Sequence, residues 1–97
     1  MSRLSLFIRD YLLEHGEDYI YNIWKAYKMW CVKKGYKPCK YASFRAFFWH
    51  LKDLGLVRKT RVERVVSRGV VVTRHYFAIA NPDERLWENP LKVKYER

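Results

Sequence analysis

The sequence predicts an α+β domain in which three helices precede a two-stranded β-hairpin and a short C-terminal tail. Three segments in succession carry apolar residues at intervals of three and four, which is the spacing of amphipathic helices. After Gly55 the period changes, and two valine-rich stretches flank Ser67-Arg68-Gly69, which is typical of a hairpin. A chain of 97 residues is long enough for one small core. We therefore expect a single domain over residues 1–80 and a tail over residues 81–97.

Three apolar stripes define the predicted helices. In chain order they are Leu4, Phe7, Ile8, Tyr11 and Leu12; Ile20, Ile23, Trp24, Tyr27 and Cys31; and Phe44, Phe47, Phe48, Leu51 and Leu54. Ser2 and Asp18 are candidate N-caps of the first two helices. The first helix is expected to leave Ser5 on its outer face. The third helix is expected to span residues 41–54, because Gly55 stops it.

The hairpin is predicted to have a three-residue loop, 67–69. This loop would pair Val66 with Val70, and the same register pairs Val57–Ile79, Lys59–Phe77 and Val65–Val71, all three on one face of the hairpin. The opposite face is then expected to carry Arg58, Thr60, Arg64, Val72, Arg74 and Tyr76. A two-residue loop would place Arg58 opposite Ile79 and mix the two faces, so we do not expect it. The base of the hairpin should lie under the helices, and residues 61–74 should project.

The tail is expected to begin with a turn at Asn81-Pro82 and to form one helical turn. Leu86, Trp87 and Leu91 are its large apolar residues, and we expect them to dock on the body of the domain. A contact between two copies of the chain is the alternative for these residues.

Two cysteines, Cys31 and Cys39, fall near the end of the second helix and before the third. A disulfide between them is geometrically feasible but is not required. The sequence has no glutamine and three asparagines, a usage that resembles hyperthermophile proteins, in which intracellular disulfides do occur. No CxxC or HxxxH spacing is present, so we expect no metal site and no cofactor.

The positive charge is confined to one part of the chain. Residues 25–74 contain 14 lysines and arginines against two acids, whereas residues 1–24 have two bases against four acids and residues 75–97 are balanced. The middle segment therefore holds all of the net charge of +10. Charge gathered in this way repels itself in the folded protein, which favours a polyanionic partner such as nucleic acid over a merely solubilising surface.

Several other classes are not expected. No apolar run approaches the length of about 20 residues that spans a bilayer, and Arg3, Arg9 and Asp10 interrupt the apolar centre that a signal peptide would need. We therefore expect no membrane partner and a cytoplasmic location. The chain has no glycine-rich phosphate loop, and its three histidines have no evident carboxylate or nucleophile partner, so an enzyme is not expected.

The segment from Ser43 to Val57, with Leu54-Gly55-Leu56-Val57 leading into the hairpin, resembles the third helix and first strand of winged helix-turn-helix domains. It looks like the same segment of small archaeal and archaeal-virus transcriptional regulators that belong to that family. The resemblance covers residues 4–80 and implies that helix 41–54 lies in the major groove of duplex DNA, with hairpin 58–76 on the flanking backbone or minor groove. It also implies a nucleoid-associated protein, in the host cytoplasm if it is viral.

That docking assigns a role to each candidate site residue. The expected DNA-binding residues are Tyr41, Ala42, Ser43, Arg45, Ala46, Trp49 and Lys52 in the third helix; Lys37 and Lys40 in the connector before it; and Arg61, Arg64, Arg68 and Arg74 in the wing. Arg45 is the candidate base reader, because its planar donor fork matches the two acceptors of guanine. Trp49 is expected either to pack under the hairpin, to fill a dimer interface or to stack on DNA. Arg68, at the tip, is the candidate for minor-groove contact.

Two other functions fit the same features. The first is a winged-helix subunit that binds an acidic protein partner. The second is an architectural protein that binds DNA or RNA without sequence preference, which the exposed aromatic residues permit. A homodimer is the default expectation for a regulator, because one small domain reads few base pairs.

Overall fold

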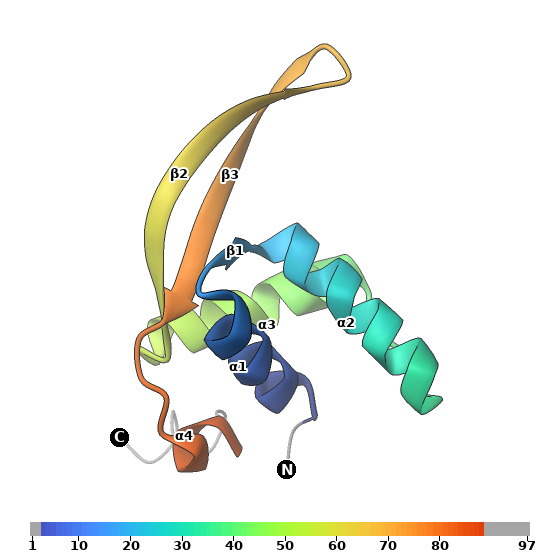
Figure 1. Ribbon diagram of the computed structural model, residues 1–97, viewed down its shortest axis with the longest axis vertical. Coiled ribbons are helices and arrows are strands. Elements are labelled where there is room, and N and C mark those ends of the chain that lie inside the picture. The colour runs from blue at the N-terminus through green and yellow to red at the C-terminus, as the bar shows by residue number, and fades with distance from the viewer. Residues whose placement is uncertain (1–2, 89–97) are drawn as a thin grey trace.

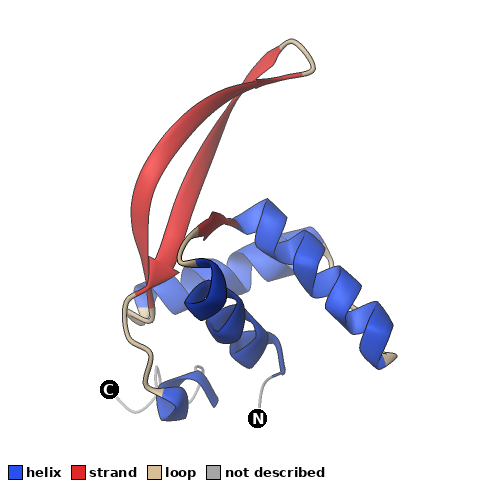
Figure 2. Ribbon diagram, in the orientation of Figure 1, coloured by secondary structure: helices blue, strands red, loops and turns tan. Residues whose placement is uncertain are grey.

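The computed structural model describes residues 3–88 and confirms an α+β architecture. The elements are α1 (Arg3–His15), β1 (Asp18–Tyr19), α2 (Ile20–Lys34), α3 (Tyr41–Asp53), β2 (Val57–Ser67), β3 (Val70–Ile79) and α4 (Glu84–Glu88). Three helices pack together, and the β2–β3 hairpin projects from them in a long curve (Figure 1). Figure 2 shows that this projection consists almost entirely of the two strands. The predicted cap Ser2 lies outside the described residues.

The sheet has three antiparallel strands in the order β1-β3-β2, one strand more than predicted. In β1, Asp18 pairs with Phe77 and Tyr19 pairs with Tyr76. The expectation that Asp18 caps α2 is wrong, because the N-cap is Tyr19. Asp18 instead accepts hydrogen bonds from the Tyr19 amide at 2.8 Å and from Asn22 Nδ2 at 2.6 Å. The carboxylate thus holds β1 at the start of α2.

The hairpin has the predicted register at its base but not at its outer end. The base pairs include Val57–Ile79 and Lys59–Phe77, as expected. A bulge between Lys59 and Arg61 then shifts the register by one residue. The outer pairs are Val62–His75, Glu63–Arg74, Arg64–Thr73, Val65–Val72, Val66–Val71 and Ser67–Val70. The predicted three-residue loop is therefore wrong: only Arg68 and Gly69 form the turn, and their φ angles of 53° and 78° match a type I′ turn.

The bulge explains why a two-residue loop is compatible with a buried base. One extra residue in β2 moves the side chains beyond it to the other face of the sheet. Arg64 consequently lies on the opposite face from Arg74, and Val65 lies on the same face as Val72, both contrary to prediction. We call residues 62–75, which extend beyond the pairing with β1, the arm.

The core lies between the helices and the base of the hairpin. Phe77 is fully buried and meets Phe48 of α3 edge to face, with ring centroids 5.0 Å apart. Val57 is also buried and Ile79 is partly buried, which confirms that the hairpin base packs under the helices. Ser5 was expected on the outer face of α1, but it is fully buried.

The segment after β3 completes this core. Trp87 of α4 is fully buried, and its Nε1 donates to the backbone oxygen of Asn81 at 2.7 Å. The hydroxyl of Ser5 donates to the backbone oxygen of Trp87, and Arg9 Nε donates to that of Pro82 at 3.0 Å. Docking of the tail on the body is thus confirmed for residues 81–88, while Leu91 lies outside the described residues.

The connection between α2 and α3 is fixed by Trp24. Its Nε1 donates to the backbone oxygen of Cys39 at 3.1 Å, and its ring lies 5.3 Å from that of Tyr41 at the start of α3. Tyr21 adds a third ring, 5.4 Å from Tyr41. Both cysteines are free, with Cys31 buried and Cys39 half-buried, so the structure does not contain the disulfide. Burial raises the pKa of the Cys39 thiol.

Candidate nucleic-acid interface

A hollow with a volume of about 490 Å³ lies between α3, the start of α2 and the arm. Helix α3 contributes Tyr41, Arg45 and Trp49, which follow one another at intervals of four residues and so share one side of the helix. The arm contributes Arg74. Four of the residues predicted to bind DNA therefore surround one concave surface.

The other residues that line this hollow were not predicted. They are Tyr19, Ile20, Tyr21 and Lys25 from β1 and α2, and Ser67, Val72, Thr73 and His75 from the hairpin. Sequence reasoning missed them because the two-residue strand β1 is what brings the start of α2 beside β3. The one sequence feature that points to any of them is the start of the basic segment at Lys25.

Helix α3 has the two predicted faces. Phe44, Phe48 and Leu51 are buried, while Phe47 and Leu54 are partly buried. The exposed residues of its first half are Ala42, Ser43, Arg45 and Ala46. The first half of this helix therefore presents small side chains, a hydroxyl and a guanidinium to solvent, near the end where the helix dipole favours an anion.

Trp49 lines the hollow and is half-buried. Its ring meets Phe77 edge to face at 5.8 Å, and Lys52 Nζ lies 4.7 Å from the ring centroid. Of the three positions expected for Trp49, the structure shows packing under the hairpin. Because the same indole also lines the hollow, it joins the hydrophobic core to the candidate interface.

The predicted cations fall into two groups. Arg61 and Arg74 form ion pairs with acids of the same chain. No ion pair links any of the others to another residue within 3–88; these are Lys37, Lys40, Arg45, Lys52, Arg64 and Arg68, together with the unpredicted Lys25. An anionic partner can thus approach the second group without displacing a carboxylate.

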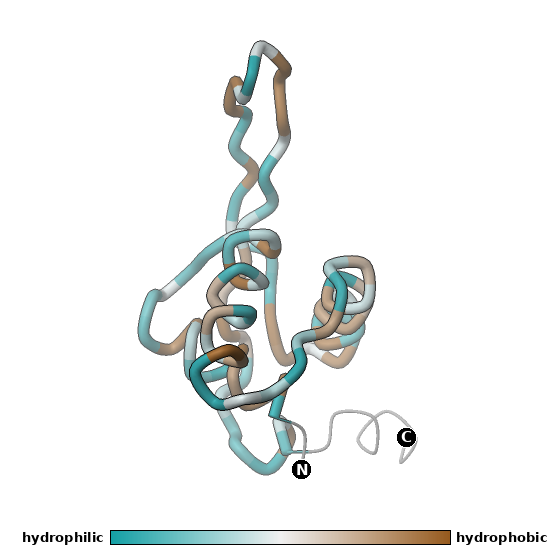
Figure 3. Tube along the Cα trace, turned by 90° about the vertical axis from the view of Figure 1, so that its right-hand side faces the viewer, coloured by the Kyte–Doolittle hydropathy of each residue, from teal (hydrophilic) through white to brown (hydrophobic). Residues whose placement is uncertain are grey.

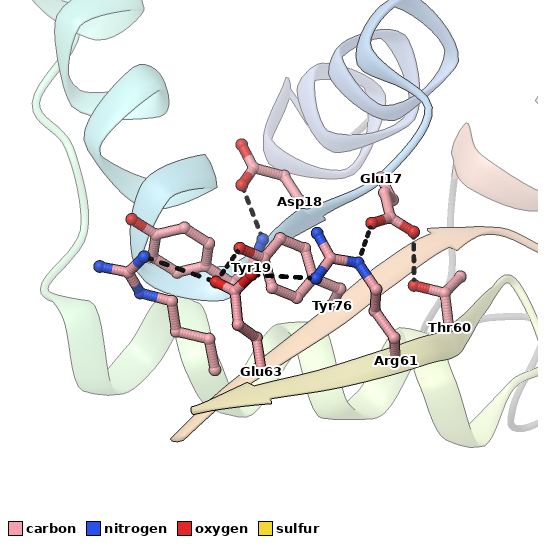
Figure 4. Close-up of polar contacts among 8 residues, drawn as sticks. Glu17, Asp18, Tyr19, Thr60, Arg61, Glu63 and Tyr76 are labelled. Atoms are coloured by element: carbon pink, nitrogen blue, oxygen red, sulfur yellow. Dashed lines mark hydrogen bonds and ion pairs between the residues drawn. The ribbon is translucent and has the colours of Figure 1, made fainter. Parts of the chain in front are cut away.

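Two glutamates hold the base of the arm (Figure 4). Glu17, in the loop before β1, accepts hydrogen bonds from Arg61 Nε at 2.6 Å and from Thr60 Oγ1 at 2.9 Å. Glu63 accepts from Tyr76 Oη at 3.0 Å and from Arg61 Nη1 at 3.2 Å, and it lies 3.9 Å from Arg74 Nη1. Glu17 thereby ties the bulge to the loop before β1, whereas Glu63 links the two strands of the hairpin to each other.

Two aromatic rings support the same arginines. The Arg61 guanidinium lies 3.8 Å from the centroid of the Tyr76 ring. The Arg74 guanidinium lies 4.5 Å from that of Tyr19. Since guanidinium groups stack favourably on aromatic faces, the Arg74–Tyr19 contact links the arm to β1, while the Arg61–Tyr76 contact lies within the hairpin. DNA binding by Arg61 and Arg74, as predicted from the sequence, would therefore compete with these internal contacts.

The acids of this network should titrate below their ordinary range. Hydrogen bonds from Arg61 and then Thr60 lower the pKa of Glu17, and those from Tyr76 and then Arg61 lower the pKa of Glu63. A depressed folded-state pKa adds stability above the unfolded-state pKa, and this stability is lost as the pH falls through the folded value. The arm should therefore be held least firmly in acid.

We expect an Arg61→Ala substitution to raise the Glu17 carboxyl pKa toward its ordinary value, because Arg61 is the main cause of the depression. An NMR titration that follows the side-chain carboxyl carbons measures this directly. Arg64→Ala, on the opposite face of the arm, is the matched control and should leave the Glu17 midpoint unchanged. An equal midpoint in the wild-type and Arg61→Ala proteins would contradict the network.

The geometry of the hollow and the arm is what points to a function. Within residues 3–88, no helix is long and apolar enough to cross a membrane, and no group of three or more metal-binding side chains occurs. The candidate interface is a concave, basic and aromatic surface beside a projecting arm. Comparison with known proteins adds no identity, since no family model, no curated protein and no solved structure matches the chain.

Proposed function

We propose that this chain is a winged-helix protein that binds duplex DNA as a transcriptional regulator. In this proposal α3 enters the major groove, and the arm acts as the wing on the flanking minor groove or backbone. One observation carries it: the exposed side of α3 and the concave side of the arm line the same basic hollow. A convex duplex can contact both at once.

The distribution of paired and unpaired cations supports this orientation. Arg45 projects from the exposed side of α3, where a guanidinium can reach base edges. Ser43 lies in the first turn of α3, where a hydroxyl and the helix dipole favour a phosphate. Lys25, on the facing side of the hollow, is placed to neutralise a neighbouring phosphate.

We expect the affinity for duplex DNA to fall steeply with salt. The cations proposed as phosphate contacts are Lys25, Lys37, Lys40, Lys52, Arg64 and Arg68, which gives a log–log slope of about −5 for one protomer. A dimer on DNA should roughly double this slope. Anisotropy titrations of a labelled duplex across a range of salt concentrations measure it.

A matched pair of lysines in α2 sharpens this experiment. Lys25→Ala should reduce the magnitude of the slope by about one, whereas Lys33→Ala, at the opposite end of the same helix, should leave it unchanged. Binding that is absent or independent of salt would refute the proposal. Stronger binding to single strands or RNA than to duplex DNA would favour the architectural alternative, and capture of an acidic protein that survives nuclease treatment would favour the protein-binding alternative.

A further inference from the structure

The outer end of the arm is apolar on both of its faces. On one face Val66 pairs with Val71, and these residues are 75% and 64% exposed. On the other face Val65 pairs with Val72, next to Val70, which is 62% exposed. Figure 3 shows these hydrophobic stretches on both strands toward the end of the arm. Exposing such an apolar surface to water raises the free energy of the protein, so we expect a binding partner to cover it.

The two-sided pattern limits what that occupant can be. A hairpin that lies flat on a surface needs apolar side chains on one face only, with polar side chains on the other. Here the valine pairs alternate between the faces, so both faces gain from being covered. The shape that fits is a groove with two walls.

The charges of the arm select the chemistry of that groove. Glu63 is the only acid in the arm, and it already lies beside Arg74. Arg64 and Arg68 have no ion pair with any other residue of the described range, and they flank the valines. If the arms of two copies stacked on each other, Arg64 and Arg68 of one copy would lie close to the same arginines of the other, and their positive charges would repel. A groove with apolar walls and anionic rims suits them, and the DNA minor groove has sugars for walls and phosphates for rims.

We propose that the valine-rich end of the arm enters the DNA minor groove as a wedge and bends the duplex. This inference rests on the proposed function but goes further, since it predicts a deformation of the DNA. Six residue pairs extend the arm by about 20 Å beyond β1, enough to leave the α3 site and reach the adjacent minor groove. That groove is only about 6 Å wide, so two strands with their side chains require it to open. Opening by apolar side chains unstacks base steps and bends the helix axis.

The test compares bending with binding. A duplex of about 30 base pairs, long enough to include the adjacent groove, carries a fluorophore at each end, and energy transfer reports its bend. The wild-type protein should bend this duplex by between about 20° and 90°. The double variant Val66→Thr and Val71→Thr keeps β-branched side chains of similar shape but replaces a methyl with a hydroxyl in each, so the hairpin should still form. Circular dichroism checks that it does.

The double variant should lose most of the bend and bind the intact duplex about tenfold more weakly, with the same salt slope. On a duplex made flexible by two unpaired bases, its affinity should return to within about twofold of the wild type. Val62→Thr lies on the same face but nearer the body, and it is the matched control that should bend DNA normally.

Three results would overturn the wedge. They are a wild-type complex that binds without bending, a double variant that bends as the wild type does, and wild-type binding to anionic lipid vesicles that the double variant loses. The first two leave DNA binding by α3 intact. A wild-type protein that binds no duplex at all would instead refute the proposed function itself, so the two failures are distinguishable.

Discussion

Trp87→Ala is expected to lower the free energy of unfolding by about 3–5 kcal/mol, since it removes a fully buried indole and leaves a cavity. The loss is large because a domain of this size is stable by only about 5–15 kcal/mol. Two hydrogen bonds also depend on this position: the indole donates to Asn81, and the backbone oxygen receives the buried hydroxyl of Ser5. Urea unfolding followed by circular dichroism measures the change.

Leu86→Ala is the matched control for this prediction. Leu86 is the neighbouring residue of α4 and is only half-buried, so its truncation should cost less. If Trp87→Ala unfolds at the wild-type urea concentration, α4 is not part of the cooperative unit. The expected result would show that the boundary between domain and tail, placed at residue 80 from the sequence, cuts through one core.

The helices were predictable because their signals are local. Stripes such as Phe44, Phe48 and Leu51 repeat within one element, and the burial of that element follows its own period. The end of α3 was predicted to within one residue, because Gly55 adopts a φ of 78° that other residues rarely adopt. The buried base of the hairpin was predictable for the same reason, since Phe77 and Ile79 alternate with less apolar neighbours.

The outer register was not predictable, because alternation carries no information where both faces are apolar. Valines occupy positions 65, 66, 70, 71 and 72, so a shift of one residue exchanges one valine for another. The bulge after Lys59 leaves no sequence signal, although it decides which face Arg64 occupies. The valines on both faces that make the register unpredictable are also the residues that make the arm a candidate wedge.

The ion pairs that set Arg61 and Arg74 apart from the other arginines of the hairpin could not be predicted, because one partner, Glu17, is far away in the sequence. Glu17 meets Arg61 across 44 positions, and nothing near Arg61 in the chain indicates that contact. Ser5 is also hidden by sequence separation: its polar side chain predicted exposure, but its hydroxyl donates to the backbone of Trp87 in α4, 82 positions along the chain. By contrast, the side shared by Tyr41, Arg45 and Trp49 follows from helical spacing alone, and the structure places all three at the hollow.

Arg45→Ala is expected to cost about 1–3 kcal/mol of binding free energy on the preferred DNA sequence and to relax discrimination at one base pair. Arg45 is exposed on α3, so the substitution should leave the unfolding midpoint unchanged. Selection of binding sites from random duplexes gives the preferred sequence, and titrations of its single-base variants give the discrimination. Arg68→Ala at the tip of the arm is the matched control: it removes one cation from the turn and should weaken binding to every sequence alike. If Arg45→Ala weakens all duplexes equally while Arg68→Ala changes the preferred base, the arm reads the sequence and α3 only positions the protein.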